Sequence, residues 1–217
     1  MAEAAVGGSE RHAGVVRWTH WVIALSFAAL LVTGVEILIS HPRFYWGETG
    51  NVRMEPLFTL PIPASRGSVP TGYRFVLEDQ NSWSRSLHFQ SAWLVFFTAV
   101  LYGFWGILQG HFRKNLAPGG GQGGDEWTYN TYQRVAYLSV VFVLFPLMFW
   151  TGLAMSPAFV AAFPFTVTVF GGQQSARTIH FFVTLALVVF VVGHVVMVYR
   201  AGFVKRTRAM ITGRMKG

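Results

Sequence analysis

The stretch IHFFVTLALVVFVVGHVVMVY, residues 179–199, decides the fold of this chain. It contains no charged residue, and about 20 predominantly apolar residues are enough for a helix to cross the hydrocarbon core of a membrane. Its two histidines, His180 and His194, lie fourteen residues apart. On a helix they are ~21 Å apart along the axis and within ~40° of the same face. One membrane-spanning helix is therefore expected to carry an imidazole near each face of the bilayer, with both imidazoles on one side of the helix.

The rest of the chain has the same character. Of its 217 residues, 53% are hydrophobic and only 12% are charged, about half the charge of a typical soluble domain. A soluble helical bundle would need polar stripes every three to four residues, and the apolar stretches lack them. We therefore predict an all-α fold, an integral membrane four-helix bundle that forms a single domain over residues 1–217, with spans at about 17–39, 86–109, 134–155 and 176–200. The third span has no histidine and is expected to act as a scaffold, with a kink at Pro146.

Lysine and arginine predict the orientation of these spans. The segments before the first span, between the second and third, and after the fourth carry eleven of the seventeen basic residues. The connection at 40–85 carries five of the other six, and a loop of this length has less influence on topology. Both termini are therefore predicted to be cytoplasmic. The net charge of +8 then faces anionic membrane lipid rather than nucleic acid.

The chain has no cysteine, which excludes disulfides, thiolate-held iron–sulfur clusters and covalent haem attachment. Four histidines remain at two depths in the predicted bundle. His20 and His194 lie near the cytoplasmic face, and His88 and His180 lie near the opposite face. A single intramembrane histidine can simply bond a neighbouring helix, but four at two matched depths favour two haems, each held by two imidazoles. Two imidazoles leave iron no open position, which favours electron transfer over oxygen chemistry.

Three arginines support this interpretation. Arg17, Arg85 and Arg177 each precede one of the four histidines by three residues, which places them on the same helix face and one turn nearer water. Haem propionates point to water and pair with guanidinium groups, so these arginines are predicted to bind propionates. The alternative is ordinary snorkelling at span ends. Gly34, fourteen residues after His20, would lie at the depth of the other haem, although generic helix packing explains it almost as well.

The long connection at 40–85 is rich in aromatic residues and arginine, so we expect it to be ordered. It is longer than a bundle needs and suits a docking surface for another protein, the alternative being a simple lid. The apolar stretch 157–172, broken by Pro157 and Pro164, is expected to join the third and fourth spans at the membrane interface.

The motifs Arg17-Trp18-Thr19-His20-Trp21 and Leu87-His88, with the spacing of the two histidines in the last span, resemble a known family. They are similar to the four-helix dihaem cytochrome b subunits of formate dehydrogenase, nickel–iron hydrogenase and thiosulfate reductase, which are related to bacterial cytochrome b561. The segment His41-Pro42 with Tyr45-Trp46-Gly47-Glu48 looks most like the thiosulfate-reductase type. The resemblance implies two haems b, exchangeable quinone or quinol, and a periplasmic catalytic subunit, often a molybdopterin enzyme with a bridging iron–sulfur subunit.

The expected function is that of a membrane anchor in the bacterial cytoplasmic (inner) membrane. It would pass electrons between the quinone pool and a periplasmic oxidoreductase subunit, and would be the electron-transfer subunit of a quinone-linked respiratory complex with no catalytic residue of its own. The alternative is a stand-alone cytochrome b561-like quinol or superoxide oxidoreductase. A haem-free scaffold or transporter is a third reading. Polar groups expected near quinone are His111, Arg113 and Asn115, whose alternative role is loop solvation.

Overall fold

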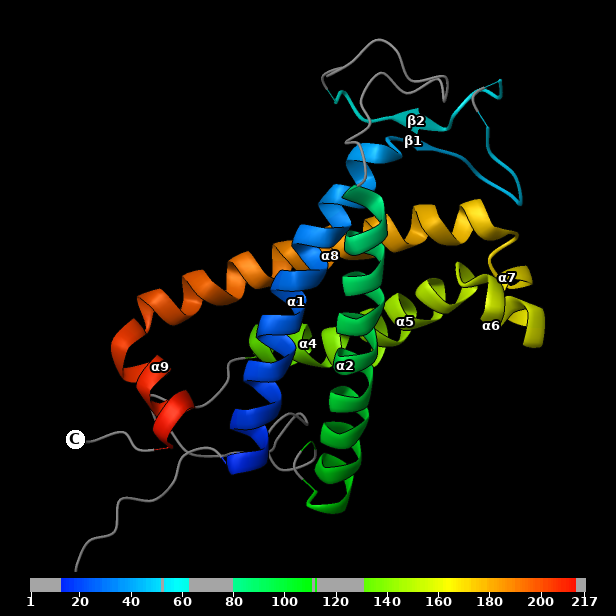
Figure 1. Ribbon diagram of the computed structural model, residues 1–217. Helices are drawn as coiled ribbons and strands as arrows, with labels where there is room; N and C mark the ends of the chain where they lie inside the picture. The colour runs from blue at the N-terminus through cyan, green and yellow to red at the C-terminus, as the bar shows by residue number, and fades with distance from the viewer. Residues whose placement is uncertain (1–12, 52, 63–79, 111, 113–130, 214–217) are drawn as a thin grey trace, which may run out of the picture.

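Four helical segments of the computed structural model are long and apolar enough to cross a membrane (Figure 1). The structure describes residues 13–51, 53–62, 80–110, 112 and 131–213. The segments are helix α1 (Gly14–Ser40), helix α2 (Gln80–Leu108), the continuous run of α4 (Thr131–Ser139), η1 (Val140–Leu144) and α5 (Phe145–Ala154), and helix α8 (Gln173–Arg200). Each of these candidate spans coincides with one of the four predicted spans, with ends that differ by up to six residues. His111, Arg113 and Asn115 lie outside the residues whose side chains the structure describes.

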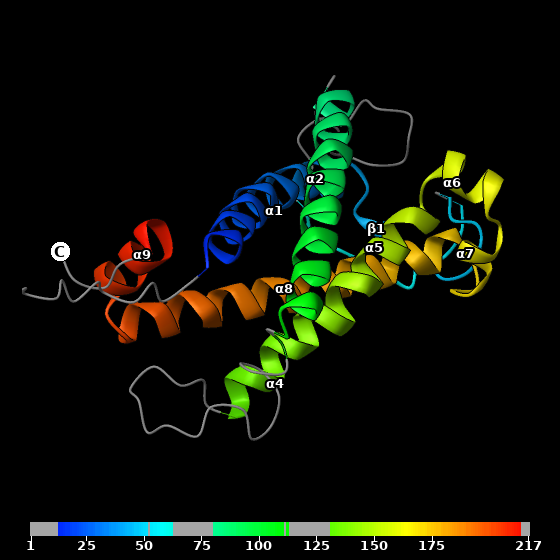
Figure 2. The ribbon, with the colours of Figure 1, turned by 90° about the horizontal axis from the view of Figure 1, so that it is seen from below.

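The helices pack as two pairs. Helix α1 lies along α2, and the α4–η1–α5 run lies along α8, with the second pair crossing the first in both views (Figures 1 and 2). The buried face of α1 repeats a small hydroxyl residue every seven positions, and α2 does the same: Thr19, Ser26, Thr33 and Ser40 on α1, and Ser84, Ser91 and Thr98 on α2. A seven-residue repeat keeps one seam facing a partner helix, and small side chains let membrane helices approach closely. Large apolar side chains such as Leu25 and Val189 are exposed, as expected of surfaces that face lipid.

The third span is interrupted just before its proline. Residues Val140–Leu144 form a π-helical turn, and Pro146 follows in the first turn of α5. Proline has no N–H and its ring clashes with the carbonyl one turn earlier, so a widened turn at this point accommodates it. Two short helices, α6 (Pro157–Ala162) and α7 (Phe165–Thr168), then connect α5 to α8.

The connection after α1 begins as an ordered segment that lies on the start of α8. Strand β1 (Arg43–Phe44) pairs antiparallel with β2 (Phe58–Thr59). The buried Phe44 ring stacks on Phe58 at 4.6 Å between ring centres and contacts Phe181 of α8 at 4.7 Å. The structure describes residues 40–51, 53–62 and 80–85 of this connection, so the expectation of order over its whole length stays a prediction.

Backbone groups of this loop cap the N-terminus of α8. The carbonyl oxygen of Gly47 accepts hydrogen bonds from the amides of Gln174 and Ser175, at 2.9 and 3.2 Å. The Gly47 amide donates to Ser175 Oγ at 2.7 Å. Gly172 permits this approach, because its φ is +131° and a Cβ there would collide with the backbone of Gly47 and Glu48. The loop therefore fixes the first turns of the helix that carries His180 and His194.

At the opposite end, helix α9 (Phe203–Thr212) folds back towards the start of α1 (Figure 2). The chain turns through Gly202, whose φ of +94° suits glycine. Trp21 Nε1 of α1 donates a hydrogen bond to the carbonyl oxygen of Met210 at 3.2 Å, and Ala209 is buried. This short helix was not predicted from the sequence.

Candidate haem-binding site

The structure brings the four histidines together in the pairs expected from the sequence. His20 of α1 and His194 of α8 have ring centres 6.3 Å apart, with ring planes inclined by 52°. His88 of α2 and His180 of α8 lie within electrostatic range of each other nearer the loop end. We call these the terminal pair and the loop pair. Each pair joins α8 to a helix of the other helical pair.

The two rings of the loop pair are held in the same way. His88 Nδ1 lies 2.9 Å from Thr33 Oγ1 of α1, and His180 Nδ1 lies 2.9 Å from Thr151 Oγ1 of α5. Both threonines are fully buried. Each imidazole is therefore fixed by a hydroxyl on the helix that packs beside its own.

These contacts decide which ring nitrogen carries the proton. A hydroxyl has one proton to donate. Thr33 Oγ1 donates it to the Ala29 carbonyl oxygen at 2.7 Å, and Thr151 Oγ1 donates to the Leu147 carbonyl oxygen at 2.8 Å. Each hydroxyl must then accept from the imidazole, so Nδ1 carries hydrogen and Nε2 carries the lone pair. This is the arrangement of an imidazole that binds metal through Nε2 and donates its other N–H to a supporting group.

A glycine follows each of these threonines. A Cβ on Gly34 would lie 3.6 Å from Cε1 of His88, and a Cβ on Gly152 would lie 3.7 Å from Cε1 of His180. The backbone of the supporting helix therefore runs close beside each ring. Gly34 lies at the loop pair, which is the depth expected for it from its distance to His20.

The terminal pair has weaker support. His194 Nδ1 lies 3.3 Å from Tyr137 Oη of α4, and the ring of Phe190 stacks on it at 6.1 Å. Within the part of the chain that the structure describes, the buried Nδ1 of His20 has no hydrogen-bond partner.

The ring separation fits haem iron. Two imidazoles on opposite sides of one metal ion, each bound at about 2 Å as imidazole nitrogens are, have ring centres roughly 6 Å apart. The 6.3 Å between His20 and His194 agrees with this value. The donor set is also that of a haem with both axial positions filled by neutral imidazole.

The structure places the three candidate arginines in different settings. Arg177 Nη1 donates to the carbonyl oxygen of Arg43 at 3.0 Å, and its Nη2 donates to the carbonyl oxygen of His41. Its guanidinium also lies 4.8 Å from the centre of the Phe44 ring. Arg17 reaches the C-terminal end of α9, where a Cβ on Gly213 would collide with its guanidinium. Arg85 is exposed at the start of α2. Propionate binding by these arginines stays a prediction.

His41 lies outside the spans, beside two of these arginines. Burial lowers the pKa of His41, and the charges of Arg177 and Arg85 lower it further, while a hydrogen bond with the Ile37 carbonyl oxygen partly offsets both effects. His41 therefore favours its neutral form where the loop leaves α1.

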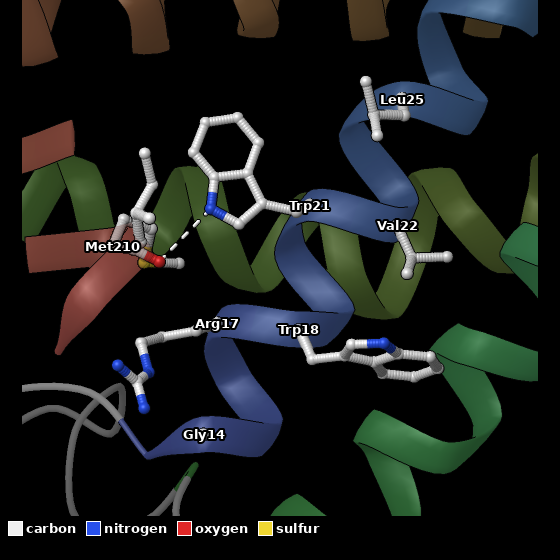
Figure 3. Close-up of a pocket in the computed structure, with 8 residues that line it drawn as sticks. Gly14, Arg17, Trp18, Trp21, Val22, Leu25 and Met210 are labelled. Carbon is white, nitrogen blue, oxygen red and sulfur yellow. Dashed lines mark hydrogen bonds between the residues drawn. The ribbon is translucent and has the colours of Figure 1, made fainter. Parts of the chain in front are cut away.

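A pocket of about 540 Å³ lies between α1 and α9 (Figure 3). Trp21 and Arg17 point towards α9, whereas Trp18 points away from it. The Trp21 ring also meets His20 edge-on at 5.2 Å between ring centres. The wall is mainly apolar and comes from α1 and α9: Gly14, Arg17, Trp18, Trp21, Val22, Leu25, Met210 and Ile211.

Comparison with known proteins identifies the class. Residues 11–213 match the family described as prokaryotic cytochrome b561, and the chain therefore belongs to this family. The family binds haem b and transfers electrons in the membrane. Together with the four apolar helices, membership makes this a multi-pass bacterial membrane protein.

One relative is a protein of Azospira oryzae named "Putative protein-methionine-sulfoxide reductase subunit YedZ1". The two are 28% identical over 223 residues, which cover 93% of this chain and 96% of the relative. No solved structure matches the chain. The resemblance to cytochrome b561 is thus confirmed for the family, and the finer resemblance to the thiosulfate-reductase type stays a prediction.

Sequence analysis missed the groups that hold the histidines, namely Thr33, Thr151 and Tyr137. One signal was present, since the dipeptide Thr-Gly occurs in both the first and the third span, at Thr33-Gly34 and Thr151-Gly152. In both places it supports a histidine of the loop pair.

Proposed function

We propose that this chain is a dihaem electron-transfer subunit, with one haem b held by His20 and His194 and a second held by His88 and His180. The observation that carries the proposal is that α8 contributes one imidazole to each pair and that each meets a histidine from α1 or α2. A bound haem b supplies one-electron transfer at each site. With the two histidines of α8 fourteen residues apart, the sites are ~21 Å apart along that helix.

The chain's own residues hold, orient and shield these sites. The four imidazoles would hold the iron of the two haems, and a haem held by two imidazoles would have no place for oxygen to bind. Thr33, Thr151 and Tyr137 orient three of the rings. The termini are proposed to be cytoplasmic and the loop periplasmic, with Arg17, Arg85 and Arg177 near the propionates.

The partner is proposed to be a periplasmic oxidoreductase that docks on the loop. In support, the loop is fixed to α8 by buried hydrogen bonds yet exposes Trp46 and Leu57, each at 59% of its surface. The relative's name describes a subunit of a reductase for oxidised methionine in proteins. We infer a partner of that class. Its catalytic subunit would carry molybdopterin, as the resemblance to dihaem subunits of molybdopterin enzymes implies. Quinol is proposed to supply the electrons at the cytoplasmic side, where the pocket beside Trp21 gives access from the lipid.

The test is a count of haem in purified chain and in four variants. We expect two non-covalent haems b per chain, one lost in His20→Ala or His194→Ala and the other lost in His88→Ala or His180→Ala. His41→Ala, outside the spans, is the matched control and should retain both. A variant of the four that keeps both haems with unchanged spectra contradicts the assignment, and a colourless wild-type preparation from cells well supplied with haem contradicts the function.

A stand-alone quinol or superoxide oxidoreductase is the second candidate. The pocket lined by Trp21, whose ring meets the His20 ring edge-on, favours it, since quinol bound there would lie near a haem with no partner chain. The purified chain, reconstituted in vesicles with oxidised quinone and supplied with superoxide, separates the two. Steady turnover without any added protein, in which superoxide is oxidised to oxygen and its electrons, with protons from water, reduce quinone to quinol, supports the second candidate, whereas a single reduction of the haems followed by no turnover supports the electron-transfer subunit.

A further inference from the structure

We propose that Thr33 and Thr151 are positioning residues that lower the reduction potential of the haem at the loop pair relative to the haem at the terminal pair. The inference rests on the proposed function, because it needs haem at His88 and His180. It concerns two side chains that do not touch the iron and act only through the imidazoles.

Hydrogen bonding gives the direction of the effect. Each threonine hydroxyl accepts the Nδ1 hydrogen of its histidine while donating to a carbonyl of its own helix. An imidazole that donates its N–H is a stronger base at its other nitrogen. A stronger donor stabilises oxidised iron more than reduced iron, and axial ligands and their hydrogen bonds set haem potential. Loss of either hydroxyl should therefore raise the potential.

The two hydroxyls are protected from competition by water, and the nearby acceptors besides them are the backbone carbonyl oxygens of Leu30 for His88 and of Met148 for His180. Thr33 and Thr151 are 0% exposed, so water does not replace them as acceptors. Each hydroxyl is also polarised, because donating to a carbonyl strengthens its ability to accept. Gly34 and Gly152 then bring the helix backbone close beside each ring, which leaves the ring little freedom to turn away.

The terminal pair lacks this arrangement. His194 has only the longer contact with Tyr137 at 3.3 Å, and in the described part of the chain His20 Nδ1 has no partner. At the loop pair, both imidazoles therefore have a hydroxyl partner at 2.9 Å. At the terminal pair, one imidazole has a longer contact and the other has no such partner. We expect unequal potentials, with the lower one at the loop pair.

The experiment is a potentiometric titration of the purified dihaem protein in nanodiscs, for the wild type, Thr33→Val and Thr151→Val. Valine keeps the shape of threonine and removes the hydroxyl. Single variants His88→Ala and His20→Ala identify which potential belongs to which site. A tenfold change in the ratio of the site's affinities for oxidised and reduced iron is about 59 mV for a one-electron couple. We expect an upward shift of that order at the loop pair in each variant and none at the terminal pair.

Two controls separate tuning from damage. Thr19 is buried on the same helix and makes the same bonds to its own carbonyls, with Val15 at 2.8 Å and Val16 at 3.2 Å. Thr19→Val should therefore leave the loop-pair potential unchanged. Thr33→Ser keeps the hydroxyl and should behave as the wild type.

Each outcome decides the proposal. A selective upward shift of the loop-pair potential in Thr33→Val and Thr151→Val, with wild-type behaviour in Thr33→Ser, supports it. Unchanged potentials, equal shifts at both sites, or a Thr33→Ser variant that matches Thr33→Val overturns it. In all of these cases the protein still binds haem, so the proposed function fails only if the wild type binds none.

Discussion

Replacing Arg177 by methionine should release the loop from α8. The side chain donates two charge-assisted hydrogen bonds to loop carbonyls, those of His41 and Arg43, and lies over the Phe44 ring. Methionine keeps much of the length and apolar stem of arginine but cannot donate. The remaining anchors are the Ser175 contact with Gly47 and a bond from Thr178 Oγ1 to the Tyr45 carbonyl oxygen at 2.8 Å. The loop should stay folded but open more often.

The size of the effect follows from these bonds. Hydrogen bonds to charged groups contribute about 1.5–3 kcal/mol each. Because Arg177 is only partly buried, the low end applies, and two bonds give about 3 kcal/mol. At about 1.4 kcal/mol per factor of ten, the open population should rise about 150-fold. The cation–π contact adds a smaller amount of the same sign.

Hydrogen exchange measured by mass spectrometry on protein in nanodiscs reports this population. The amides of Gly47, Leu57 and Leu60 donate hydrogen bonds in the closed loop and exchange only when it opens. Arg200→Met, an exposed arginine at the other end of α8, is the matched control. Exchange in the loop that rises less than tenfold, or that rises equally in the control, refutes the reasoning. Loss of one haem with unchanged loop exchange would instead assign Arg177 to a propionate.

Three further outcomes are expected. Tyr137→Phe should raise the potential of the terminal-pair haem by less than the threonine variants raise the other, because the 3.3 Å contact with His194 is weaker, and the same titration measures it. Gly172→Ala should lower thermal stability by more than Gly171→Ala. Both glycines have positive φ, where alanine costs about 1–3 kcal/mol of strain, but only a Cβ on Gly172 would also meet another backbone. Equal melting temperatures for the two variants contradict this. The opening equilibrium of the loop, taken as the measured exchange rate divided by the intrinsic amide rate at the same pH, should rise as pH falls below the ordinary pKa of His41 near 6.5. Burial lowers that pKa in the closed loop, so the open loop binds the proton more readily, and His41→Asn should remove this dependence.

The number of spans and the depth of each histidine could be predicted, because both follow from counting residues along the chain. Four apolar stretches of about 20 residues give four spans, and depth along each span follows from rise per residue. Depth alone pairs His20 with His194 and His88 with His180. This pairing needs no knowledge of which helices are neighbours, because His180 and His194 lie on the same helix and their difference in depth follows from their spacing.

The supporting contacts could not be predicted, because they depend on which helices are neighbours. Thr33 reaches His88 only because α1 packs along α2, and Thr151 reaches His180 only because α5 packs along α8. Hydropathy does not separate these threonines from Thr98, which is buried in the same kind of helix. The seven-residue repeat of small hydroxyl residues on α1 and α2 was readable and indicates the seam between them.

The arginines show what the spacing rule cannot predict, namely the acceptor that each side chain binds. A spacing of three residues places Arg177 on the face of His180 and one turn nearer water, as expected. The same position faces the loop, and two carbonyl oxygens occupy its donors. Spacing predicts where a side chain starts, but the neighbouring backbone determines which acceptor it reaches.

The same helix turns that hold the loop also hold the loop-pair site. Ser175, Arg177 and Thr178 bind loop backbone, and His180 follows two residues later, ~3 Å further along the axis. Phe181, the next residue, packs on Phe44 of the loop. A protein docked on the loop would therefore lie within a few helix turns of the His180 imidazole, with no flexible linker between them. This continuity would suit the proposed electron-transfer subunit, since electron tunnelling needs a short and fixed distance between donor and acceptor.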